Sequence, residues 1–242
     1  PAEIRTWQED DEPLKLVADF LKERGVASAT VGFEETNRFF LMDRLKQQLP
    51  GAGIVSANPV VRAQRMIKSP AEIALMQAAA DLNIAALRSV HPQIREGMTP
   101  ADLNKLYVAA VTALGGYTEG GLILLGEAAA YPHGSNKPQL VRRGEVILFD
   151  CVCSVHGYQA DNSRTMVFGA APTPEQRKVW EQMRRGQDVA MAAAKVGAPA
   201  GSVDDAVRST YESWGYGPGY KLPGTSHRTG HGIGMEVHEP VN

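Results

Sequence analysis

Residues 146–161 read VILFDCVCSVHGYQAD, an apolar run that leads into an aspartate, a polar turn and a second aspartate. The apolar run predicts a buried strand ending near Asp150. A turn near 155–157 then returns the chain in a second strand through Asp161 to Phe168. Because the midpoint between the two aspartates coincides with this turn, a regular hairpin places them directly opposite each other, with Cβ atoms about 5 Å apart.

Two ionised carboxylates at this distance repel each other, so they persist only if one is protonated or a cation lies between them. A divalent metal ion satisfies both groups. A bulge at Gly157 would shift the register. The alternative to a metal site is that one aspartate is an exposed turn carboxylate and the other a surface carboxylate. The hairpin alone leaves both interpretations open. Cys151 and Cys153 are too close in sequence for an ordinary structural disulfide, and we predict that they pack in the strand, with a redox or metal role as the alternative.

Histidines in glycine-rich or loop sequence form the next group of candidates. Residues 229–240 read TGHGIGMEVHEP, and the glycines permit positive φ angles or a close approach to a ligand. They also disfavour a helix, which excludes the helical zinc motif H-E-x-x-H. His231 and His238 bracket this stretch and favour a site over two separate structural roles. His133, between a proline and a glycine, is a further loop candidate for ligand binding.

Long helices are predicted on both sides of the strand-rich region, which spans about 120–168. A Ser-Pro or Thr-Pro pair opens each long helix at Ser69 and Thr173, and a glycine turn follows at Gly97 and Gly197. The offset of about 100 residues predicts two related αβ halves, unless two unrelated helix pairs merely align. Residues 1–60 predict a smaller α/β segment with helices at 13–24 and before Leu49, and short strands at 29–33 and near Ile54.

Composition narrows the class of protein. The chain has 242 residues, of which 43% are hydrophobic, and its 25 basic and 27 acidic residues give a net charge of −2. This is typical of a globular protein and argues against a basic nucleic-acid-binding surface. No apolar run approaches the ~20 residues of a membrane helix, and the acidic start does not read as a signal peptide. We therefore expect a cytoplasmic protein that binds neither nucleic acid nor membrane.

The motifs taken together resemble one family. Asp150, Asp161, the following Ser163-Arg164-Thr165, the GHGIG segment 230–234 and His238-Glu239 have the order and spacing of the pita-bread metallopeptidases, which include methionine aminopeptidase, aminopeptidase P and Xaa-Pro dipeptidase. The resemblance covers about residues 62–242. It implies an α+β fold with duplicated halves around a curved antiparallel sheet, and part of an additional N-terminal domain places the chain with the proline-specific members. The expected domains are thus 1–60, the end of the accessory domain, and 61–242, the catalytic domain.

The resemblance also implies a mechanism. Asp150, Asp161 and His231 would be metal ligands, with Asp161 bridging two divalent ions, which could be Mn²⁺, Co²⁺ or Zn²⁺. His133 and His238 would face the substrate and hold the scissile carbonyl. The implied reaction is hydrolysis of Xaa-Pro bonds by a metal-bridged water, with a dipeptide or a short peptide carrying proline at the second position as substrate. Family members commonly form homodimers through the N-terminal domain, so a homodimer is one of the expectations.

Departures from the family pattern lead to a further expectation. Val152 stands where glycine is usual and Ser163 where threonine is usual, but neither change removes a ligand. Two glutamate ligands of the family lie beyond the segment that ends at Asn242. The chain is therefore expected to be a fragment, truncated at both ends, with an incomplete site, weak metal binding and no activity of its own.

Three alternatives remain. Aminopeptidase P acts on longer peptides, and this sequence does not distinguish it from a dipeptidase. A metal-free, creatinase-like amidinohydrolase has the same fold, but the retained Asp150 and Asp161 argue against it. A non-catalytic binding module of this fold typically loses metal ligands, whereas this chain keeps each one that its sequence covers.

Overall fold

The computed structural model describes residues 4–240 and divides the chain into two compact units, Pro1–Ile67 and Lys68–Asn242. In the first unit, the strands β1 (Thr30–Phe33) and β2 (Gly53–Ser56) form a parallel pair. The helices α1 (Pro13–Glu23) and α2 (Phe39–Gln48) pack against each other. The small core of this unit consists of Leu14, Ala18, Leu45, Leu49 and Ala52. These elements agree with the α/β segment predicted from the sequence.

A third helix completes the first unit. It is α3, at Asn58–Met66, with a proline in its first turn. The domain boundary expected between residues 60 and 61 thus falls inside α3, whereas the two compact units divide after Ile67.

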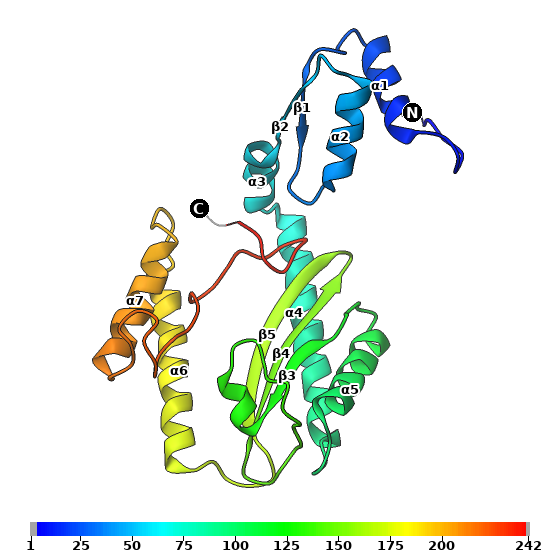
Figure 1. The fold of residues 1–242 in the computed structure, drawn as a ribbon. Helices are drawn as coiled ribbons and strands as arrows, with labels where there is room; N and C mark the ends of the chain where they lie inside the picture. Colours follow the sequence, from blue (N-terminus) through cyan, green and yellow to red (C-terminus); the bar gives the residue numbers. More distant parts are fainter. Residues whose placement is uncertain (1–3, 241–242) are drawn as a thin grey trace. The chain divides into compact units, whose positions relative to one another are not determined.

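The second unit is built on an antiparallel sheet of three strands in the order β3-β4-β5. Their bounds are Gly121–Leu125, Val146–Val155 and Tyr158–Val167. The long helix α4 (Pro70–Val90) packs against β4 and β5, and α5 (Pro100–Ala113) packs against β3 (Figure 1). Short 3₁₀ turns lie at η1 (His91–Gln93) and η2 (Gly126–Ala130). Alternate residues of β4, from Ile147 to Cys153, are buried in the core with residues of α4 and α5.

A buried polar cluster ties β4 to the helices. Asn83 of α4 is fully buried, and its side-chain amide donates to the carbonyl oxygen of Cys151 at 2.7 Å. The hydroxyl of Tyr107, from α5, lies 2.9 Å from Asn83 Oδ1 and 3.0 Å from the carbonyl oxygen of Val152. These contacts give the buried polar atoms of Asn83 and Tyr107 hydrogen-bond partners on the backbone of β4. They fix the stretch of β4 that directly follows Asp150.

Replacing Asn83 with alanine is expected to lower the free energy of unfolding by about 3 kcal/mol, because it removes two buried hydrogen bonds and opens a cavity. Gln77→Ala is the matched control, since Gln77 is an exposed amide on the same helix and its side chain donates to Asp81. Its expected change is within about 0.5 kcal/mol. Urea denaturation measures both, and equal losses would contradict the assigned role of Asn83.

The helix pair recurs in the second half of this unit. The helices α6 (Pro174–Ala193) and α7 (Gly201–Ser213) pack against each other, as α4 and α5 do. Gly97 and Gly197 have φ angles of 83° and 84°, and Gly115 and Gly215 have φ angles of 84° and 89°. These positive values are the conformation that glycine adopts without strain. The same turns therefore precede and follow the second helix of each pair, which confirms the predicted repeat.

No helix in the described range 4–240 combines the length and the apolar character that crossing a membrane requires.

Candidate functional site

The β4–β5 hairpin corrects one prediction. The strands are joined by His156 and Gly157, whose φ angles of 48° and 85° fit a two-residue type I′ turn. Asp150 consequently lies opposite Ser163, and Asp161 lies opposite Val152. The prediction that the two aspartates are directly opposite is therefore wrong, because the hairpin's midpoint falls between residues 156 and 157.

The two aspartates nevertheless share one face of the sheet. Each is displaced by two residues from the position opposite the other, and side chains alternate between faces with a period of two. The Ser163 hydroxyl donates to Asp150 Oδ1 at 2.7 Å. Burial raises the pKa of Asp161, and the neighbouring carboxylate of Asp150 raises it further, against the opposing effects of His231 and His238. The hairpin therefore holds two coupled carboxylates, as the sequence predicted, in diagonal positions.

The glycine-rich segment brings two histidines to this face. His231 Nε2 lies 3.5 Å from Asp161 Oδ2. The Nδ1 atom of His231 lies 2.9 Å from the carbonyl oxygen of Gly232, and because a carbonyl only accepts, Nδ1 carries the proton in this contact. In the neutral imidazole, Nε2 then presents its lone pair toward Asp161. The ring of His238 lies beside that of His231, with centroids 4.2 Å apart.

Backbone contacts hold this segment in place. Gly232 and Glu239 form an antiparallel bridge, in which the Glu239 N–H donates to the Gly232 carbonyl at 2.8 Å. This bridge closes a loop of residues 232–239, which we call the histidine loop. His231 directly precedes the loop, and His238 lies just before its last residue. Gln159 lies two residues before Asp161 in β5, and its N–H donates to the Gly234 carbonyl at 2.8 Å. The strand that carries Asp161 therefore also anchors the loop.

His133 is not brought into this group by any described contact. It is exposed and follows η2 in the connection to β4. Among residues 4–240, no hydrogen bond or ion pair joins it to Asp150, Asp161, His231 or His238. Its role toward the substrate therefore stays a prediction.

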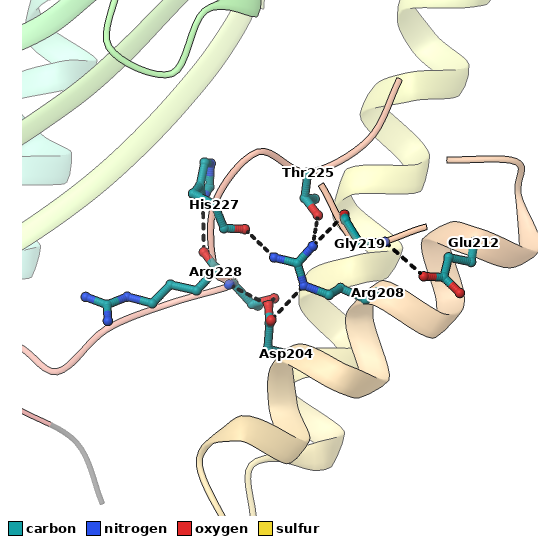
Figure 2. Close-up of polar contacts among 8 residues, drawn as sticks. Asp204, Arg208, Glu212, Gly219, Thr225, His227 and Arg228 are labelled. Atoms are coloured by element: carbon teal, nitrogen blue, oxygen red, sulfur yellow. Dashed lines mark hydrogen bonds and ion pairs between the residues drawn. The ribbon is translucent and has the colours of Figure 1, made fainter. Parts of the chain in front are cut away.

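A cluster around Arg208 was missed in the sequence (Figure 2). Arg208 of α7 pairs with Asp204 at 2.7 Å and donates to the carbonyl oxygens of Gly219 and His227 at 2.8 and 2.9 Å. Asp204 accepts from the N–H and the hydroxyl of Thr229, two residues before His231. The i, i+4 spacing of Asp204 and Arg208 predicts their ion pair. No local pattern predicts the contacts with Gly219, His227 and Thr229, because they join residues that are distant in sequence.

A second missed contact lies at the other end of the segment. Lys68 Nζ lies 2.8 Å from Glu239 Oε2, and both side chains are largely buried. In the sequence, Glu239 stands out only as part of the His-Glu pair. The two residues are far apart in sequence, so no spacing rule connects them.

The donor set fits a divalent ion by residue type. Carboxylates with a single imidazole suit Mn²⁺, Co²⁺ or Zn²⁺, and the Nε2 atom of His231 lies 3.5 Å from the carboxylate of Asp161. In the described part of the chain, however, no three His, Cys, Asp or Glu side chains are grouped closely enough to hold an ion. The structure thus brings Asp161 and His231 together and couples Asp150 to Asp161, but it does not show a complete metal site.

The two cysteines pack in the core behind this face. Cys151 and Cys153 are free thiols, 0% and 1% exposed. Burial, with smaller effects from Asp150 and Asp161, raises the pKa of Cys151 to about 12. Both thiols are therefore expected to resist a water-soluble thiol reagent at pH 8 until the protein is unfolded in denaturant. Mass spectrometry after labelling measures this, and rapid modification of the folded protein would contradict the packing.

Comparisons with known proteins identify the family. Residues 74–242 match Metallopeptidase family M24, and residues 1–67 match the Creatinase/Prolidase N-terminal domain. The Xaa-Pro dipeptidase of Lactobacillus helveticus is 28% identical, over 96% of this chain and 63% of its own length. Across the first relatives matched, the chain spans 51% to 64% of their length.

Solved structures agree with this assignment. The recombinant prolidase of Thermococcus sibiricus has a TM-score of 0.86 and 26% identity, over 100% of this chain and 65% of its own. The X-Pro aminopeptidase of Thermotoga maritima has a TM-score of 0.81 and 26% identity, over 97% and 65%. These likenesses confirm the α+β pita-bread class predicted from the sequence. Because the family match covers residues 74–242, well over half of the chain, the chain belongs to metallopeptidase family M24.

Proposed function

We propose that the native protein containing this chain hydrolyses the peptide bond that precedes proline, with Xaa-Pro dipeptides as its main substrates. The observation that carries the proposal is the pairing of Asp161 with the Nε2 atom of His231 at 3.5 Å, on the sheet face that also bears Asp150. The likeness to proteins named Xaa-Pro dipeptidase supports the substrate class.

In this proposal, Asp150, Asp161 and His231 hold divalent metal, and His133 and His238 face the substrate. Bound metal would supply Lewis acidity toward the scissile carbonyl and lower the pKa of a bound water. The carbonyl of Gly232 holds His231 in the tautomer that leaves Nε2 free for a ligand. His238 is exposed beside His231 and is placed to donate a hydrogen bond to an oxyanion.

The domain roles belong to the same proposal. Residues 1–60 would be the end of an accessory N-terminal domain, and 61–242 would carry the catalytic fold. A homodimer and a cytoplasmic location stay predictions from the sequence.

The test compares Asp161→Asn with Asp81→Asn in the native protein containing this chain, supplied with Mn²⁺, Co²⁺ or Zn²⁺. Asp161→Asn is expected to lower kcat/KM for an Xaa-Pro dipeptide by about 10³-fold, or roughly 4 kcal/mol of transition-state stabilisation. Asp81 lies on α4, outside the site, so its variant should match the unchanged protein. If the unchanged protein hydrolyses no Xaa-Pro dipeptide with any of these metals, the proposal is wrong.

An aminopeptidase that removes the residue before proline from longer peptides is the second candidate, supported by the likeness to the X-Pro aminopeptidase of Thermotoga maritima. Parallel assays on an Xaa-Pro dipeptide and on an Xaa-Pro-Yaa tripeptide separate the two. The dipeptidase proposal expects higher kcat/KM for the dipeptide.

A further inference from the structure

A buried carboxylate fills the interior of the histidine loop. The side chain of Glu239 is 1% exposed. Its Oε1 atom accepts hydrogen bonds from the backbone N–H groups of Met235 and Glu236 at 2.8 and 3.2 Å. A Cβ atom at Gly234 would lie 2.7 Å from both carboxylate oxygens, so the loop backbone closes tightly around this group. The conformation of the loop therefore depends on the carboxylate that it encloses.

Lys68 provides the countercharge. Its ammonium contacts the other oxygen, Oε2, at 2.8 Å, and its side chain is 12% exposed. Oε1 of Glu239 thus accepts from the loop backbone, while Oε2 contacts the ammonium of Lys68. Removing an ionic partner from a carboxylate buried to this degree destabilises its charged form.

The ion pair connects the loop to the framework that holds β5. Lys68 directly precedes Ser69, which caps α4 in a reciprocal capping box with Glu72. The hydroxyl of Tyr158 donates to Glu72 Oε1 at 2.7 Å, and Tyr158 is the first residue of β5. The start of α4 therefore contacts both the histidine loop and the strand that carries Asp161.

We propose that Lys68 and Glu239 are positioning residues, which set the places of His231 and His238 relative to Asp161 by closing the histidine loop onto the start of α4. His231 and His238 directly precede the bridged residues Gly232 and Glu239, so closure of the loop determines how the two rings meet. The functional part of this inference rests on the peptidase activity proposed above. Neither residue touches the substrate in this account.

The experiment uses the native protein that contains this chain, with two readouts. The first is hydrogen exchange of the Met235 and Glu236 amides, which bond to Glu239. The second is the separation of kcat from KM for Xaa-Pro dipeptide hydrolysis, at temperatures well below the Tm of each variant. Lys68→Met is expected to speed exchange of both amides at least about tenfold, because the carboxylate loses the ammonium that contacts its Oε2 atom. It should lower kcat about 10- to 100-fold with little change in KM.

Matched variants distinguish positioning from a general loss of stability. Lys68→Arg restores the positive charge and should recover most of kcat. Glu239→Gln keeps an oxygen for the two backbone amides but turns an NH₂ group toward the ammonium of Lys68, and these two donors repel each other. In the double variant Lys68→Met with Glu239→Gln the ammonium is gone. The amides of Met235 and Glu236 should therefore exchange more slowly in the double variant than in Glu239→Gln alone. Lys178→Met, which removes an exposed lysine of α6, is the matched control with unchanged kcat.

The outcomes are separable. Wild-type exchange rates at Met235 and Glu236 in Lys68→Met would overturn the inference, and so would a fall in kcat that Lys68→Arg does not recover. If the unchanged protein hydrolyses no Xaa-Pro dipeptide, the proposed function fails. The exchange rates of the double variant then still decide whether the ion pair holds the loop.

Discussion

Replacing Gly232 with alanine is expected to open the histidine loop and to reduce Xaa-Pro hydrolysis by about 100-fold or more, as a displacement near 1 Å at a catalytic group can do. A Cβ atom at this position would lie 2.5 Å from the carbonyl oxygen of Glu239 and 2.7 Å from that of Pro240. Both neighbours are backbone atoms, so no side chain can rotate away. The bridge between Gly232 and Glu239 must then break.

Gly230 provides the matched control, because it lies in the same GHGIG segment but nothing approaches within 4 Å of its added Cβ atom. Gly230→Ala is therefore expected to keep wild-type exchange rates in residues 232–239 and wild-type kcat/KM. Overpacking at Gly232 should cost about 1–3 kcal/mol, confined largely to the loop. Equal behaviour of the two variants in hydrogen exchange would show that the loop is not closed as described.

The elements of the fold could be predicted because their signals are local. The Ser-Pro and Thr-Pro pairs at Ser69 and Thr173 predicted the starts of α4 and α6, and both are capping boxes in the structure. The positive φ angles at Gly97 and Gly197 explain why these turns recur in both halves. Each of these features depends on a few neighbouring residues, which a single sequence displays directly.

The hairpin register depends on which two residues form the turn. The sequence indicated a turn near residues 155–157, and only the choice of His156-Gly157 as the two turn residues sets the pairing. The predicted partner of Asp150 was Asp161, and the partner in the structure is Ser163. Because this difference is two residues, both aspartates stay on one face. A displacement by one residue would have separated them.

Long-range contacts were beyond prediction for a different reason. Lys68 and Glu239 meet across 171 positions of sequence, and Arg208 meets the carbonyl of His227 from a helix 19 positions earlier. Charged residues of these types are usually solvated on a surface, and neither spacing matches a helix or strand period. Their burial becomes evident only when the chain is folded.

Arg208 carries the second large effect. Replacing it with methionine, which keeps much of the apolar stem, is expected to lower the free energy of unfolding by about 2–4 kcal/mol. The guanidinium pairs with Asp204 and also donates to the carbonyl of Gly219, the hydroxyl of Thr225 and the carbonyl of His227 (Figure 2). Its side chain is 14% exposed, so water replaces these bonds poorly when they are lost.

Arg184 is the matched control, because Arg184 and Asp188 form an i, i+4 pair on α6 whose side chains are 60% and 48% exposed. Arg184→Met should change the free energy of unfolding by less than about 0.5 kcal/mol, as for other exposed ion pairs. Urea denaturation compares the two variants, and hydrogen exchange locates the loss. Because Asp204 also holds Thr229, two residues before His231, exchange in Arg208→Met should rise through residues 219–229. A stability loss in Arg208→Met no greater than that in Arg184→Met would mean that the segment 219–229 is held by its own backbone contacts and not by Arg208.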